Sequence, residues 1–114
     1  MTAQNFVEQK LKVKIQEDPQ CLKGAKIQSK VVVLDVEGAA GGTWTFRFDE
    51  SGSVVVVDES PASCECTIWM KEATFEQMVS GKLNVPMAFV MRKIKVKGDV
   101  GIAGNIGLAL QKLF

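Results

Sequence analysis

The chain has 114 residues, a formal net charge of +1 and no histidine. This length fits one domain with a single core, and the near-neutral charge argues against nucleic acid as a partner, because binding phosphates needs a basic excess. Catalytic triads and zinc sites that depend on an imidazole are excluded. Three cysteines, an odd count, suit a reducing compartment. With neither a signal peptide nor an apolar run long enough to cross a bilayer, we expect a cytoplasmic protein.

The first segment, residues 2–17, fits two patterns. Its apolar residues recur at helical spacing, whereas residues 10–15 alternate like a strand. The lysine, glutamine and glutamate content favours the helix, which is our prediction. Asp18 as a helix cap, followed by Pro19, predicts a short second helix through Lys23.

β-branched and aromatic residues then predict three strands. We expect them at residues 27–37, 44–48 and 54–57. The glycine-rich reversal at 38–42 and the tight turn at 49–52 keep the connections short. The three strands should therefore form an antiparallel meander.

The second half of the chain mixes strands and helices. It contains a fourth strand, a helix closed by Gly81, a bend, a fifth strand and a last helix that begins at Gly98 or Asp99. These elements are expected at residues 64–70, 71–80, 84–86, 93–97 and 99–114. Together with the first half, they predict one α+β domain over residues 1–114.

The last helix carries three glycines one turn apart, Gly101, Gly104 and Gly107. Each costs about 1 kcal/mol against alanine inside a helix. Close packing of the helix on the sheet is the favoured explanation, and a movable flap over a cavity is the alternative. A stripe of larger apolar residues on the same helix should face the interior. It comprises Ile102, Ile106 and Leu110.

Methionine is dense between residues 70 and 91, at Met70, Met78, Met87 and Met91. Its flexible side chain suits surfaces that accept varied apolar shapes. A methionine-rich core is the commoner explanation for such a run. Together with Phe75 and Phe89, the same residues could instead line a pocket for an aliphatic chain.

A basic ladder of Lys93, Lys95 and Lys97 follows Arg92. Such a ladder is usually a solvated strand edge that prevents pairing with another sheet. The alternative is contact with anionic lipid headgroups or with a coenzyme A phosphate.

Several segments from Cys66 onward resemble, in their order and spacing, the sterol carrier protein type 2 family of non-specific lipid-transfer proteins. They read Cys-Thr-Ile-Trp-Met at 66–70, Ser-Gly-Lys-Leu-Asn at 80–84, Ala-Phe at 88–89, Lys-Ile-Lys-Val-Lys-Gly-Asp at 93–99 and Val-Gly-Ile-Ala at 100–103. The resemblance implies a mixed five-stranded sheet in the order 3-2-1-4-5 with helices over one face. It also implies an apolar tunnel between them for fatty acids, fatty acyl-CoA, sterols or phospholipids.

In the same way, the resemblance implies that the N-terminal helix touches membranes and that the C-terminal helix borders the tunnel. Four positions depart from the family pattern, and at one of them Pro86 is shifted by one residue from the family's proline. Arg92 stands where a glycine is usual, and Gly104 and Gly107 replace larger residues.

Our leading hypothesis is a monomeric lipid-binding domain without catalysis, metal or cofactor. It would transfer or present a lipid or fatty acyl ligand and contact membranes transiently. Arg92 and Lys93 are the predicted headgroup or membrane contacts. The predicted lipid-binding residues are Trp44, Phe46, Phe75, Met78, Met87, Phe89, Met91, Ile102, Ile106 and Leu110.

Two alternatives remain open. The first is an accessory domain or weak enzyme that acts on CoA thioesters. Cys66 is its candidate nucleophile, although no base partner can be named. The second is an interaction domain that grips a helix or forms a dimer.

Overall fold

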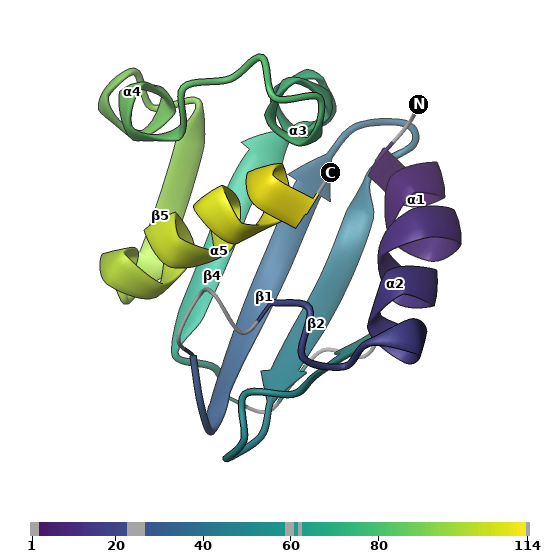
Figure 1. The fold of residues 1–114 in the computed structure, drawn as a ribbon. Helices are drawn as coiled ribbons and strands as arrows, with labels where there is room; N and C mark the ends of the chain where they lie inside the picture. Colours follow the sequence, from purple (N-terminus) through teal and green to yellow (C-terminus); the bar gives the residue numbers. More distant parts are fainter. Residues whose placement is uncertain (1–2, 23–26, 59–60, 62, 114) are drawn as a thin grey trace.

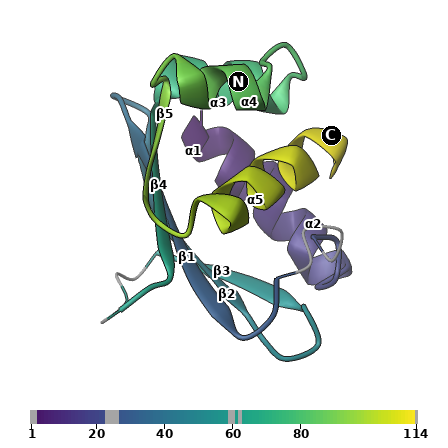
Figure 2. The same cartoon turned by 90° about the vertical axis from the view of Figure 1, so that its left-hand side faces the viewer.

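All helices that the structure describes lie on one side of a five-stranded sheet (Figures 1 and 2). The computed structural model describes residues 3–22, 27–58, 61 and 63–113; the side chains of residue 3 and residues 110–113 are not described. The core fills the layer between the sheet and the helices. This one-sided arrangement is the α+β architecture expected from the sequence.

The sheet has the order β3-β2-β1-β4-β5. β1 pairs in parallel with β4, and the other neighbours are antiparallel, so the mixed sheet and its order are confirmed. The strands are β1 (Lys30–Glu37), β2 (Gly42–Phe48), β3 (Val54–Val57), β4 (Cys66–Lys71) and β5 (Ile94–Gly98).

Alternation along the strands directs apolar side chains toward the helices. In β2, Trp44, Phe46 and Phe48 are buried, whereas Thr43 and Arg47 are exposed. This is the period-2 pattern of a strand with one face against a core.

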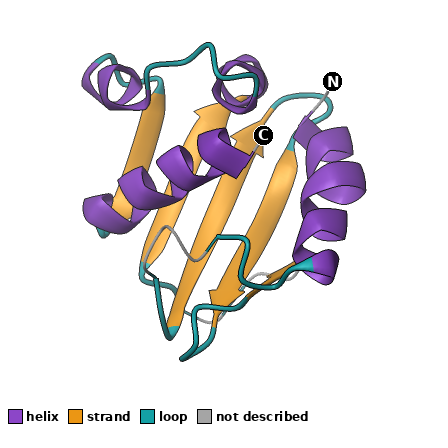
Figure 3. Cartoon of the chain, viewed as in Figure 1, coloured by secondary structure: helices purple, strands orange, loops and turns teal. Residues whose placement is uncertain are grey.

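The N-terminal segment is helical, as predicted. It runs through α1 (Ala3–Asn5), a π-helical stretch η1 (Phe6–Leu11) and α2 (Lys12–Glu17) (Figure 3). The strand alternative is wrong because the helix buries one apolar stripe against the core. The stripe comprises Phe6, Val7, Leu11 and Ile15.

The prediction of a short second helix after Asp18 is wrong for the residues that the structure describes. The chain from Pro19 to Leu22 forms turns, and Lys23 lies outside the described residues. The backbone oxygen of Pro19 accepts a hydrogen bond from the Val54 N–H at 2.9 Å. Because this bond to β3 uses the carbonyl that a helix would need, the segment joins the sheet edge instead.

A second correction concerns the bend predicted at 84–86. It is the beginning of a helix, α4 (Val85–Val90). The Asn84 side chain accepts a hydrogen bond from the Met87 N–H at 3.1 Å, and Pro86 lies in the first turn, where its missing N–H costs nothing.

The other two helices follow their predicted signals. α3 (Glu72–Val79) ends at Gly81, whose φ of +78° is the left-handed conformation that closes a helix. Asp99 precedes α5 (Val100–Leu113), and its carboxylate accepts a hydrogen bond from the Ile102 N–H at 3.2 Å. In Figure 1, α5 crosses over β5, β4 and β1.

Candidate functional site

An apolar cavity lies beneath α5. Its floor comes from β1, β4 and β5, and its walls come from α3, α4 and α5. None of the described side chains that line it carries a nitrogen or an oxygen atom. The lining residues are Leu34, Ile68, Met70, Met78, Val85, Phe89, Ile94, Ala103, Ile106 and Gly107.

This cavity is too small in the structure to hold a lipid. Its volume is about 10 Å³, which is close to the space that a single water needs, whereas pockets for drug-sized ligands span roughly 300–1,000 Å³. An apolar lining of this size stays dry. A ligand with a hydrocarbon chain therefore enters only if one of the walls moves outward.

The glycines of α5 show which wall packs tightly. A β-carbon on Gly107 would stand 3.2 Å from Val85 Cγ1 and 3.9 Å from Met78 Sδ, so this glycine lets α5 approach α4 and α3 closely. A β-carbon on Gly104 would have no neighbour within 4 Å, and one on Gly101 would meet only the Asp99 carboxylate at 3.3 Å. Close packing thus accounts for one of the three glycines.

The structure brings together three of the ten predicted lipid-binding residues at this cavity, Met78, Phe89 and Ile106. Ile102 is partly buried against the core next to them. The side chain of Leu110 lies outside the described residues.

The remaining predicted residues occupy other places. Trp44 and Phe46 are buried on β2, and the Trp44 Nε1–H donates to Glu8 Oε1 of the N-terminal helix at 3.4 Å. Phe75 is fully buried, with its ring centroid 5.5 Å from that of Phe6 in an edge-to-face arrangement.

Met87 and Met91 point away from the cavity and are 52% and 58% exposed. Arg92 and Lys93 lie in the turn between α4 and β5, and both are exposed. The predicted headgroup contacts are therefore next to the two exposed methionines and outside the cavity.

Sequence reasoning missed most of the cavity floor. Leu34 and Ile68 were treated as ordinary strand residues, and Val85 and Ala103 were not singled out. The signal for the strand residues was available: Ile68 and Met70 alternate on one face of β4, and Leu34 pairs with Ile68 across the sheet. The contribution of Val85 depends on α4, where the sequence predicts a bend instead of a helix.

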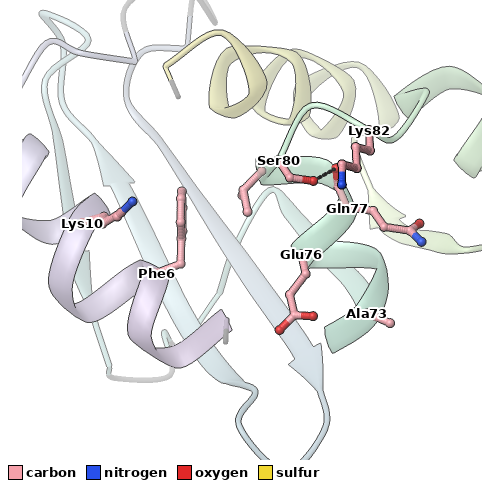
Figure 4. A pocket seen from close by; sticks show the side chains of 8 residues that line it. Phe6, Lys10, Ala73, Glu76, Gln77, Ser80 and Lys82 are labelled. Atoms are coloured by element: carbon pink, nitrogen blue, oxygen red, sulfur yellow. Dashed lines mark hydrogen bonds between the residues drawn. The ribbon is translucent and has the colours of Figure 1, made fainter. Parts of the chain in front are cut away.

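A second hollow is open to solvent and lies between η1 and α3 (Figure 4). Phe6 and Lys10 come from one side, and Glu76, Ser80 and Lys82 lie on the other (Figure 4). Its volume is about 690 Å³. Unlike the cavity, this groove combines charged and amide side chains with the apolar Phe6, Ala73 and Val79, and it is open to water.

The cysteines do not form a reactive centre among the described residues. Burial raises the pKa of the Cys66 thiol to about 11, and the nearby Asp99 carboxylate adds to this shift. Burial also raises the pKa of Cys21. A thiol that stays protonated at neutral pH is a poor nucleophile, which disfavours Cys66 as a catalytic residue.

Among the described residues, no group of three metal-ligating side chains is placed to hold an ion. None of the described helices has the length and apolar character that crossing a membrane requires.

Residues 9–111 match the model of the SCP-2 sterol transfer family. The chain is 32% identical over 88 residues to hydroxysteroid dehydrogenase-like protein 2 of Pongo abelii, a match that covers 77% of this chain and 20% of that protein. The chain therefore spans about a fifth of the length of this relative.

Solved structures show the same fold. The palmitated SCP2L2 of Aedes aegypti superposes with a TM-score of 0.68 at 19% identity and covers 96% of this chain and 95% of its own. Sterol carrier protein domain 2 of Helicoverpa armigera gives a TM-score of 0.66 at 20% identity, with 96% and 87% of the two chains covered.

Proposed function

Because the chain belongs to the SCP-2 sterol transfer family, we propose that it binds the apolar part of a lipid between the sheet and α5. The ligand is a fatty acid, a fatty acyl-CoA, a sterol or a phospholipid, and the domain transfers or presents it as a monomer. The observation that carries this proposal is the cavity beneath α5, whose lining side chains are all apolar.

The chemistry of the cavity suits a hydrocarbon chain. Each methylene that leaves water contributes about 0.8 kcal/mol, so roughly ten buried methylenes contribute about 8 kcal/mol before the cost of binding. Part of this free energy separates α5 from α4 and the sheet, because the cavity without a ligand is too small for a hydrocarbon chain. No general base or metal takes part, since binding is driven by burial alone.

The open groove between η1 and α3 is a weaker candidate for the chain of the ligand. A hydrocarbon placed there would displace water from Lys10, Glu76 and Lys82 without replacing their hydrogen bonds. It suits the polar end of a ligand better than the apolar end.

A second candidate function follows from the small fraction of the relative's length that this chain matches. The matched segment is 20% of the Pongo abelii protein, whose name marks it as dehydrogenase-like. An accessory role, in which the domain presents an acyl thioester to an enzyme, is consistent with that arrangement. A higher affinity for palmitoyl-CoA than for palmitate would favour it, and equal affinities would count against it.

Lipid extraction tests the main proposal. The purified protein is extracted with organic solvent and the extract is analysed by mass spectrometry, with a blank purification as control. In parallel, palmitate, palmitoyl-CoA and cholesterol are used to displace a fluorescent fatty acid. The proposal predicts a stoichiometric lipid or saturable displacement. A lipid-free extract together with no saturable binding would refute it.

A further inference from the structure

The helix α4 exposes apolar side chains on its solvent side. Met87, Val90 and Met91 are 52%, 77% and 58% exposed, respectively. The opposite side of the helix is occupied by Val85 and Ala88, which are buried. In Figures 1 and 2, α4 lies at an outer corner of the molecule, beyond the end of the sheet where β5 begins.

A basic hollow adjoins the turn that follows this helix. Its volume is about 400 Å³, and its lining includes Lys71, Arg92, Lys93 and Lys95 together with Trp69. The Lys95 ammonium lies over the Trp69 ring, 4.8 Å from its centroid.

None of these four cations forms an ion pair within the described part of the chain, although Glu37 is the neighbour of Lys71 across the β1–β4 ladder. The two ion pairs among the described residues both involve Lys12, near the opposite edge of the sheet. Gathering like charges in one hollow is unfavourable unless an anion joins them. The hollow therefore favours an anionic partner, and the chemistry of such a partner must also accommodate the exposed apolar residues beside it.

The backbone at Arg92 adds a second observation. Its φ of +59° is the left-handed conformation, which L-residues with a side chain adopt at a cost and which glycine adopts freely. The Arg92 N–H donates to the Phe89 carbonyl at 3.1 Å and the Lys93 N–H to the Ala88 carbonyl at 2.9 Å, so the turn is well defined. A cation thus occupies a position where glycine would be more stable.

We propose that the corner formed by α4 and the turn into β5 is a docking surface for a bilayer that contains anionic phospholipids. Val90 and Met91 enter the interfacial region, while Arg92 and Lys93 contact lipid phosphates. A bilayer of this kind contacts both the exposed apolar residues and the basic residues of the corner. A soluble phosphate would contact the basic residues alone.

The N-terminal helix offers less to a bilayer in this conformation. Its apolar stripe is packed into the core, and Val13, at 44% exposure, is its one exposed large apolar residue among those described. By contrast, α4 presents apolar residues outward, while its own Val85 and Phe89 line the cavity. Docking at α4 would therefore place the bilayer directly against a wall of the proposed lipid site.

Vesicle flotation with the lipid-extracted protein tests this proposal. Phosphatidylcholine vesicles are compared with vesicles that also contain phosphatidylserine. We expect binding to the anionic vesicles that weakens with salt. Arg92→Gln/Lys93→Gln should lower the partition coefficient about tenfold to thirtyfold, and Val90→Gln/Met91→Gln should lower it on anionic vesicles without changing the salt dependence. The control variant Lys30→Gln/Arg47→Gln removes the same charge at the opposite end of the sheet and should bind like the wild type.

Arg92→Gly separates docking from stability. Glycine relieves the left-handed backbone and removes the cation, so this variant should unfold at the same or a higher temperature and bind anionic vesicles less tightly. The proposal is overturned if the wild type ignores anionic vesicles, if the control loses as much binding as the α4 variants, or if Lys10→Gln/Lys14→Gln alone abolishes binding. It is also overturned if inorganic phosphate or coenzyme A binds the corner and vesicles do not. Displacement of the fluorescent fatty acid is measured on the same variants, so failure of docking and failure of cavity binding are distinguishable.

Discussion

Gly107 of α5 lies so close to Val85 of α4 that a β-carbon on the glycine would stand 3.2 Å from Val85 Cγ1. Three residues earlier, a β-carbon on Gly104 would have no neighbour within 4 Å. The two glycines therefore have different roles. One permits close packing over the cavity, and the other has no packing role there; under the proposed function it adds backbone freedom to the helix that moves to admit a ligand.

Alanine at these two positions should have opposite effects on stability. Gly104→Ala should stabilise the protein by about 0.5–1 kcal/mol, because it lowers the entropy of the unfolded chain and improves helix propensity. Gly107→Ala should cost about 1 kcal/mol or more relative to Gly104→Ala, because its methyl group crowds Val85. Urea unfolding of both variants checks this, and equal stabilities would mean that α5 does not pack on α4 as described.

Filling the cavity should block the ligand. Ile106→Trp adds bulk inside a cavity of about 10 Å³, whereas Leu108→Trp adds the same group on the exposed side of the same helix, where Leu108 is 43% exposed. Affinity for the fluorescent fatty acid should fall at least about tenfold in the first variant, as apolar burial is lost.

The Leu108→Trp variant should retain wild-type affinity. Circular dichroism establishes that each variant is folded, and Ala103→Met provides a milder filling variant if Ile106→Trp unfolds. Unchanged affinity in both filled variants would place the ligand elsewhere.

The Cys66 thiol should make stability fall at high pH. Its pKa is raised from 9.0 to about 11 in the folded protein, chiefly by burial. The unfolded chain therefore loses this proton first, and the stabilisation of the folded state decreases as the pH rises from about 9 to about 11. The difference in unfolding free energy between wild type and Cys66→Ala should shift with pH over this interval. Parallel stability curves for the two proteins would contradict the burial of Cys66.

The cap of α4 should be measurable by a single substitution. Asn84→Ala removes the acceptor of the Met87 N–H and should cost about 1 kcal/mol of unfolding free energy. Asn84→Asp, which keeps the acceptor, should cost much less. Chemical denaturation checks both variants, and an equal loss for both would show that the cap does not support the helix.

Most of the sheet could be predicted because its strands are long and alternate clearly. Trp44, Phe46 and Phe48 face the core as their spacing indicates. The α4 helix was missed because Asn84 and Pro86 also occur in bends, and only the hydrogen bond from the Met87 N–H distinguishes a cap from a turn. Similarly, Asp18 and Pro19 resemble a helix start, but the bond from Val54 to the Pro19 carbonyl ties the segment to β3.

The cavity was harder to predict than the fold. Met78, Phe89 and Ile106, three of the predicted lipid-binding residues, line it, whereas Met87 and Met91 are exposed. A helix of six apolar or small residues has no polar face to mark its solvent side, so its orientation depends on packing that periodicity does not reveal. The contributions of Leu34 and Ile68 come from strand pairing across the parallel β1–β4 ladder.

The position of a bound hydrocarbon chain tests the central claim most directly. Uniformly ¹³C-labelled palmitate is added to the lipid-extracted protein, and isotope-filtered nuclear Overhauser contacts to the side chains are recorded. We predict contacts from the chain methylenes to the Met78 and Ile106 methyl groups beneath α5. Contacts confined to Phe6 and Val79, in the open groove between η1 and α3, would contradict the account.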